Sequence, residues 1–338
     1  MKKITLLSLC WSAALLADGA PSEPNSPAGP VVTDWADFFF TAEFIWWKAQ
    51  QDGLAYAQSG RATSLTSVPH AGSEADAHFD FEPGFKVGGG LNWRYDGWDL
   101  YANYTWLSPA AHTASIHQKS STGGLQAVWP TEVTTGATPT FFSLSRASDQ
   151  WKVAFSAVDT EMGRNFFVST KMTLRPFIGF KAAWIHQHNT VNYHVADTNF
   201  VAISQASMKM HQEYTGFGIR GGLNTAWRCS DDWSIFGNAA FSELWSRFDN
   251  HRIDQLTSSG VKFTNYALRK KFHGLTPVLE LALGLRYTKD FRNHKWRLDL
   301  SAAWELQTFF SQNRFLSPIE RQGDFTLQGA TARIGFAF

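Results

Sequence analysis

Charged side chains recur at every second position inside segments that are otherwise aromatic and aliphatic. In the terminal segment Arg333 lies between Ala332 and Ile334, and in an earlier one Glu305 lies between Trp304 and Leu306. Alternate side chains of an extended chain point to opposite sides, so each segment has one apolar and one polar face. The charged residues of the polar faces are Glu43, Lys86, Arg94, Asp99, Lys152, Arg175, Lys181, Arg220, Glu280, Arg286, Arg297, Asp299, Glu305 and Arg333.

These residues predict the lining of a lumen. Basic members outnumber acidic members, which predicts a weak anion preference if the lumen holds water, since rings of charge set the selectivity of a pore. The alternative is a set of arginine–carboxylate pairs that fill and stabilise a narrow lumen. A small barrel leaves both interpretations open, because eight strands enclose a space that side chains just fill.

Two smaller groups of residues suggest other chemistry. His186 and His188 lie two positions apart and could share a metal ion, but no third ligand is near, and solvated loop histidines are the better interpretation. Asp249 and His251 could form part of a protease site at the rim of a lumen, although any barrel with polar loops could contain such a pair. We expect no catalytic residue, no metal and no cofactor.

The segments that carry the alternation predict ten β-strands. They span residues 38–49, 85–95, 98–106, 151–164, 172–186, 211–228, 233–248, 275–287, 295–307 and 327–338. Short links lie at 96–97, 168–171, 229–232 and 288–294, and Asp96-Gly97 suits a two-residue hairpin turn because both residues tolerate positive φ. Long polar segments lie between the other strands, at 50–84, 108–149, 188–210, 249–272 and 308–323.

Tight turns at one end and long loops at the other are typical of outer-membrane barrels, in which the turns face the periplasm. We therefore predict an all-β fold, a transmembrane antiparallel β-barrel of ten strands, or of twelve if the 110–129 region adds a hairpin. Aromatic residues flank the turns and predict a girdle at one membrane interface. They are Trp93, Tyr95, Trp98, Trp227, Trp233, Tyr287 and Trp296, and the closing strand ends on the aromatic carboxyl-terminal residue Phe338.

Composition supports the same class. Aromatic residues make up 15% of the 338 residues, yet no run of 18 apolar residues follows the N-terminus, which excludes a helical membrane protein. Lys2 and Lys3 precede an apolar stretch that ends on small residues, so residues 1–17 are predicted to be a signal peptide, 18–36 a flexible segment and 37–338 the barrel. Cys229 is the one cysteine beyond the signal peptide, and we expect it to be an unpaired thiol in a tight turn.

Several segments resemble the Legionella-type major outer membrane protein family, whose members also occur in environmental relatives of chlamydiae. The most specific is RPFIGFKAAWI at 175–185. The others are FFFTAEFIWWKAQQDGLAYA at 38–57, PGFKVGGGLNWRYDGWDLYANYTWL at 83–107, YTGFGIRGGLNTAWR at 214–228 and TLQGATARIGFAF at 326–338. The resemblance implies an abundant pore-forming surface protein without a catalytic motif. A disulfide-linked envelope, as in pathogenic chlamydiae, is not expected with Cys229 alone.

The main hypothesis is a non-enzymatic, porin-like barrel in the outer membrane of a Gram-negative bacterium, reached after signal-peptide cleavage, that passes ions or small solutes. The alternatives are a closed-lumen structural or adhesive surface barrel and, less favoured, an outer-membrane protease; a secreted lipocalin-like binder would lack the girdle. Expected partners are outer-membrane lipid, the barrel assembly machinery through the C-terminal strand, and ions or small solutes. A formal net charge of +1 gives no reason to expect nucleic acid.

Overall fold

The computed structural model describes residues 36–61, 72–93, 96–108, 112–118, 123–129, 131–132, 139–140, 143–196, 203–291, 296–317 and 322–338. The predicted signal peptide, nearly all of the predicted flexible segment, and Arg94 and Tyr95 lie outside these ranges. Within the part of the chain that is described, no helix has the length and apolar character needed to span a bilayer.

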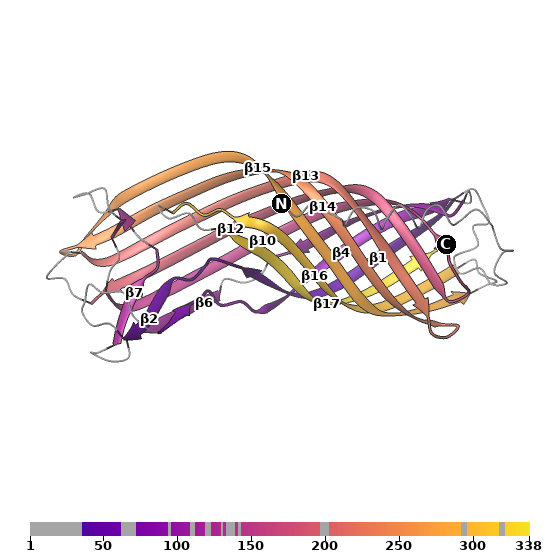
Figure 1. The fold of residues 1–338 in the computed structure, drawn as a ribbon, viewed down its shortest axis with the longest axis horizontal. Helices are drawn as coiled ribbons and strands as arrows, with labels where there is room; N and C mark the ends of the chain where they lie inside the picture. Colours follow the sequence, from indigo (N-terminus) through magenta and orange to yellow (C-terminus); the bar gives the residue numbers. More distant parts are fainter. Residues whose placement is uncertain are drawn as a thin grey trace, which may run out of the picture.

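Ten strands form one closed antiparallel barrel, which confirms the predicted fold class (Figure 1). Each strand pairs with its neighbours in chain order, β17 pairs with β1, and β10 pairs with β12. The strands are β1 (Ala36–Gln51), β4 (Phe81–Trp93), β5 (Trp98–Leu107), β10 (Leu144–Arg164), β12 (Met172–Val195), β13 (Ile203–Arg228), β14 (Trp233–Ser258), β15 (Val261–Phe291), β16 (Trp296–Asn313) and β17 (Gly323–Ala337).

The short strands do not add a hairpin to the barrel wall. In the 110–129 region, β6 (His112–His117) pairs with the loop-side part of β10, and β7 (Gly123–Ala127) joins a small sheet with β2 (Ala57–Arg61) and β3 (Gly72–Ala75). Another short strand, β11 (Phe166–Phe167), pairs with β12, and β8 (Thr131–Glu132) pairs with β9 (Pro139–Thr140). The closed wall therefore has ten strands, and the alternative of a twelve-stranded wall is not observed.

The two ends of the barrel differ as predicted. Asp96 and Gly97 have φ of 61° and 68° and connect β4 to β5, at the end where β1 begins and β17 terminates. Cys229 is free and exposed in the turn between β13 and β14 at this same end. We refer to this end as the turn side and to the opposite end as the loop side.

On the loop side, two predicted loops are largely strand. Residues 249–272 form a continuous hairpin of β14 and β15 that turns at Ser259 and Gly260, and most of 188–210 belongs to β12 and β13. These strands have 24 to 31 residues, against roughly 10 needed to cross a membrane. Figure 1 shows them running on together well past the barrel. The backbone pairing thus continues beyond the lipid, where the outer face no longer has to be apolar.

The outer wall carries an exposed apolar band. On β15, the outward positions from Leu275 to Leu285 are leucine except Pro277, whereas His273 and Lys271 lie above them. An exposed belt of this kind is what a lipid-facing barrel surface requires. The band begins on the turn side with Trp227 and Trp233, which are 64% and 51% exposed.

Candidate functional site: the barrel lumen

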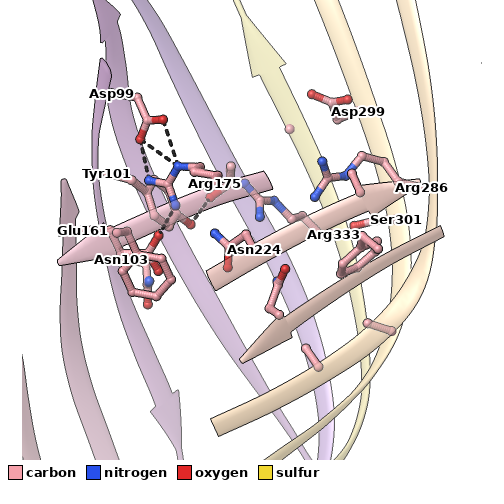
Figure 2. Close-up of a pocket in the computed structure, with 18 of the residues that line it drawn as sticks. Asp99, Tyr101, Asn103, Glu161, Arg175, Asn224, Arg286, Asp299, Ser301 and Arg333 are labelled. Carbon is pink, nitrogen blue, oxygen red and sulfur yellow. Dashed lines mark hydrogen bonds and ion pairs between the residues drawn. The ribbon is translucent and has the colours of Figure 1, made fainter. Parts of the chain in front are cut away.

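The turn-side half of the lumen contains a cavity of about 920 Å³. Figure 2 shows Asp99, Arg175 and Glu161 on one wall and Arg286, Arg333 and Asp299 on the other. Eleven of the predicted lumen residues line this cavity: Glu43, Lys86, Asp99, Arg175, Arg220, Glu280, Arg286, Arg297, Asp299, Glu305 and Arg333.

An ion-pair network crosses the inner end of this cavity. Arg220 on β13 donates to Glu161 on β10 (2.7 Å) and to Glu280 on β15 (3.0 Å). Lys181 on β12, which is fully buried, bonds Asp159 (2.9 Å) and reaches Glu280 at 3.1 Å. Because β12 and β15 are separated by two intervening strands, these side chains cross the lumen interior. The network satisfies buried charges that would be costly if left unpaired.

Two further groups extend the network. Arg175 forms a bidentate contact with Asp99 and also donates to Glu161 at 2.6 Å. On the far wall Lys86 of β4 is paired with Glu305 of β16, and its ammonium lies 4.5 Å from the centre of the Trp47 ring. Bidentate arginine–carboxylate geometry fixes orientation as well as charge, so the lining is held in one arrangement.

Two arginines on the cavity wall lie over aromatic rings and form no close ion pair. The Arg286 guanidinium lies over the Phe236 ring at 4.9 Å and forms no ion pair with a described residue. The Arg333 guanidinium lies over the Tyr101 ring at 5.6 Å, with Glu43 at 3.7 Å. In register they lie on the two strands that flank Ser301 of β16, on the same wall. The cavity lining as a whole holds six basic and seven acidic side chains, so the predicted excess of basic groups is not found there.

An aromatic layer closes the lumen on the loop side of the ion pairs. It consists of Phe155, Tyr214, Phe248, Phe309 and Phe325, each at most 2% exposed. Phe155 on β10 and Phe309 on β16 come from opposite sides of the barrel, with four strands between them in either direction, yet their ring centres are 5.9 Å apart. Tyr214 and Phe325 also contact Phe309, at 6.3 and 6.0 Å. Rings from opposite walls therefore meet at this level, and their burial shows that water does not reach them.

A layer of buried glutamines adjoins the aromatic layer toward the loop side. The Gln187 amide on β12 donates to Gln51 on β1 and to Gln312 on β16, both at 2.8 Å. Gln212 on β13 donates to the Gln312 carbonyl at 2.9 Å, and Trp151 donates to Gln187 at 3.1 Å. These bonds again join strands that are not neighbours, so the closure has a second, hydrogen-bonded level.

Comparison with known proteins identifies the family. The family model described as the Legionella pneumophila major outer membrane protein precursor matches residues 31–338. The chain belongs to this family. Together with the closed barrel and its apolar outer band, this establishes an outer-membrane β-barrel of a Gram-negative bacterium.

Other comparisons are more distant. A search of curated proteins found no match. Among solved structures, the outer membrane protease OmpT from Escherichia coli is similar at 10% identity and a TM-score of 0.44, covering 89% of this chain and 96% of that one. The Pseudomonas putida toluene transporter TodX is similar at 11% identity and a TM-score of 0.28, covering 92% of each chain. A FadL homologue from Pseudomonas aeruginosa gives 8% identity, 90% coverage of each chain and a TM-score of 0.28.

One residue predicted to line the lumen, Lys152, faces outward instead. Lys152 is exposed on β10, whereas its neighbours Trp151 and Val153 are buried inside. In the sequence, apolar residues on both sides of Lys152 look like a lipid-facing row, which would place Lys152 in the lumen. In the structure these apolar residues pack in the interior near the aromatic layer, so Lys152 faces outward. From Ala147 to Arg164 the alternation on β10 continues without a break, so Asp159 and Glu161, whose orientation was ambiguous from the sequence, also face inward. A carboxylate cannot remain in the lipid-facing band without a large cost, and that rule could have located both.

Part of the predicted aromatic girdle lies at the turn side of the barrel, and a second group of exposed tryptophans lies at the other edge of the apolar band. Trp227, Trp233, Tyr287 and Trp296 lie at the turn side, with Trp233 5.2 Å from Tyr287, while Trp93 and Trp98 contribute to the mouth of the cavity. Phe338 stacks on Trp296 at 5.9 Å. At the loop-side edge of the apolar band the exposed tryptophans are Trp46, Trp106, Trp245 and Trp304.

The histidine and protease candidates lie on the outer face. His188 contacts His211 of the next strand, with 3.1 Å between their Nδ1 atoms, instead of sharing a ligand with His186. Asp249 and His251 do meet, at 3.1 Å, but the pair lies outside the wall and Asp249 is also held by Arg269 at 2.7 Å. A protease site would need these groups at the rim of the lumen.

Proposed function

We propose that this protein is a non-enzymatic surface barrel whose lumen is closed at rest. The contact between Phe155 and Phe309 carries the proposal, because a layer that joins opposite walls blocks ions whatever the charge below it. The glutamine layer reinforces the block with hydrogen bonds. Of the functions compatible with this family, a structural or adhesive role agrees better with this interior than an open porin does.

The loop-side extension is the surface that such a barrel would present. From Arg247 to Ser258, β14 continues for roughly 35 Å along the strand, taking about 3.3 Å per residue. The hydrophobic core of the barrel continues into the extension, where Trp129, Tyr193, Met208 and Leu256 are at most 1% exposed. A packed, strand-built platform can display loops rigidly above the membrane. We also propose that the barrel assembly machinery recognises β17 together with Phe338, the aromatic residue that follows it.

A second candidate is a gated porin with anion preference. Arg286 favours it, because this cavity-lining arginine forms no ion pair with a described residue and can attract an anion that enters from the turn side. Passage would then require the aromatic layer to open.

Planar-bilayer recording of the refolded full-length barrel in asymmetric KCl separates the candidates. The closed barrel predicts no conductance steps over hours at moderate voltage. Steps that appear only above a threshold voltage, with a reversal potential on the chloride side, would support the gated porin. Ohmic steps at all voltages would refute the closed lumen.

A further inference from the structure

A row of basic side chains crosses the outside of five neighbouring strands on the loop side. It consists of Lys152, His188, His211, His251 and Arg269, which are partners in consecutive strand pairs from β10 to β15. The row lies on the outer face, because the residues on either side of each member in β10, β12, β13 and β14 are buried. Arg269 on β15 lies on the same face as its register partner His251. Strand register thus aligns Lys152 and Arg269 with three histidines between them, of which His188 has its pKa lowered by burial and by His211.

The row lies just above the membrane. Six residues below it on the same strands is an entirely apolar row, formed by Val158, Ala182, Phe217, Trp245 and Leu275. With a strand tilt of about 40°, six residues correspond to a height of about 15 Å. Because the row follows the strand pairing, it is inclined with the strands and changes height by about 12 Å over its four strand spacings of about 4.8 Å. The basic row consequently crosses the headgroup region of the outer leaflet at an angle.

Most charged side chains on this surface are basic, and three of them lack a carboxylate partner among the described residues. The exposed cations Lys152, Lys209 and Arg247 form no ion pair with a described carboxylate. Arg269 and Lys271 clamp Asp249, at 2.7 and 3.0 Å, and these bonds hold the pKa of that carboxyl well below its usual range.

Glu213 is similarly bound by His211 at 3.0 Å, and that hydrogen bond lowers the pKa of the Glu213 carboxyl. The two acids thus hold the basic side chains in place.

The basic side chains of this surface outnumber its acids. Lys152, Lys209, Arg247, Arg269 and Lys271 share the outer face with only two described carboxylates at these levels, Glu213 and Asp249. This excess of positive charge favours an anionic partner.

We propose that this basic surface binds the phosphate groups of a phosphorylated glycolipid in the outer leaflet. Phosphate oxygens accept charge-assisted hydrogen bonds from lysine and arginine, and clustered cations beside a membrane contribute about 1 kcal/mol each to anionic-lipid binding. One kcal/mol corresponds to about a fivefold change in affinity, so removing three uncommitted cations weakens binding about 100-fold.

The test measures binding of the refolded protein to neutral micelles doped with diphosphorylated lipid A, with dephosphorylated lipid A, or with phosphatidylglycerol. The variant is Lys152→Gln/Lys209→Gln/Arg247→Gln. The control, Lys171→Gln/Arg228→Gln/Lys289→Gln, removes the same charge at the turn side. Folding of each protein is verified by its heat-modifiable gel mobility, and if the triple variant does not fold, Arg247→Gln alone should lose about fivefold.

The proposal predicts tight binding to diphosphorylated lipid A, a roughly 100-fold loss in the loop-side variant, and less than a twofold change in the control. Equal affinity of both variants, or equal affinity for the dephosphorylated lipid, would overturn the phosphate site. Equal affinity for phosphatidylglycerol would overturn the assignment to a glycolipid. Lumen conductance is independent of all these outcomes.

Discussion

Asp149 gives a prediction about stability that depends on one buried carboxyl. The residue lies on β10 above the lipid-facing band, is fully buried, and neither carboxylate oxygen accepts a hydrogen bond from a described residue. Burial raises the pKa of the Asp149 carboxyl to about 7, from 3.8 in the absence of the fold. The folded state therefore binds a proton that the unfolded state releases between about pH 4 and pH 7.

The sign and size of the effect follow from proton linkage. Because the folded pKa is the higher one, stability is lost as pH rises from about 4 through 7, and the loss is complete above pH 7. At about 1.4 kcal/mol per pKa unit, the ionised carboxyl costs up to about 4 kcal/mol at pH 8. Asp149→Asn keeps the shape of the protonated form and removes this cost, so the variant should be more stable by about 2–4 kcal/mol at pH 8 and nearly unchanged at pH 4.

Urea unfolding of the refolded barrel in detergent, followed by tryptophan fluorescence at pH 4 and pH 8, measures this difference. Comparing Asp149→Asn with the wild type at each pH cancels the titration of the histidines. Asp231→Asn, in the exposed turn after Cys229, is the matched control and should change nothing. An Asp149→Asn effect that is equal at both pH values, or destabilising at pH 8, would refute the reasoning.

Other predictions concern the ion pairs and the orientation. Arg220→Met leaves Glu161 and Glu280 without their shared partner and should destabilise the barrel by about 3–5 kcal/mol in the same urea assay. Arg164→Met, which breaks an exposed ion pair, should cost less than about 1 kcal/mol. Equal effects of the two variants would contradict the role of the lumen network. In intact cells a membrane-impermeant maleimide should label Ser259→Cys in a Cys229→Ser background and should label wild-type Cys229 only after the outer membrane is permeabilised; the reverse pattern would invert the assigned orientation.

The membrane-spanning part of the fold was predictable from sequence because lipid imposes a strict alternation. The hairpin turn at Asp96-Gly97 and the ten-strand count follow from that constraint and from turn chemistry. The extension of β14 and β15 did not follow, because outward residues such as His251 and Lys271 are polar and resemble a loop once lipid no longer selects them. Strand pairing continues there through backbone bonds and through the loop-side part of the hydrophobic core, and neither leaves a clear periodic signal in the sequence.

The charged lining of the lumen was predictable from the sequence, but the aromatic layer across it was not. Arg175 on β12 and Glu280 and Arg286 on β15 line the cavity, because inward and outward positions alternate regularly along those parts of the strands. On β10 the interior changes from charged at Glu161 to aromatic at Phe155, so an apolar side chain there faces inward and Lys152 faces outward. Whether aromatic rings from opposite walls meet depends on barrel diameter and strand stagger, which one sequence does not specify.

Single-channel recording of wild-type protein beside Phe155→Ala/Phe309→Ala tests the central claim most directly. Removing both rings deletes the contact that joins opposite walls, while the ion pairs on the turn side keep the barrel folded. We predict that the wild type is silent and that the double variant conducts, with its folded state verified by gel mobility. A wild type that conducts as well as the folded double variant would contradict the account, because the aromatic layer would then not be the barrier.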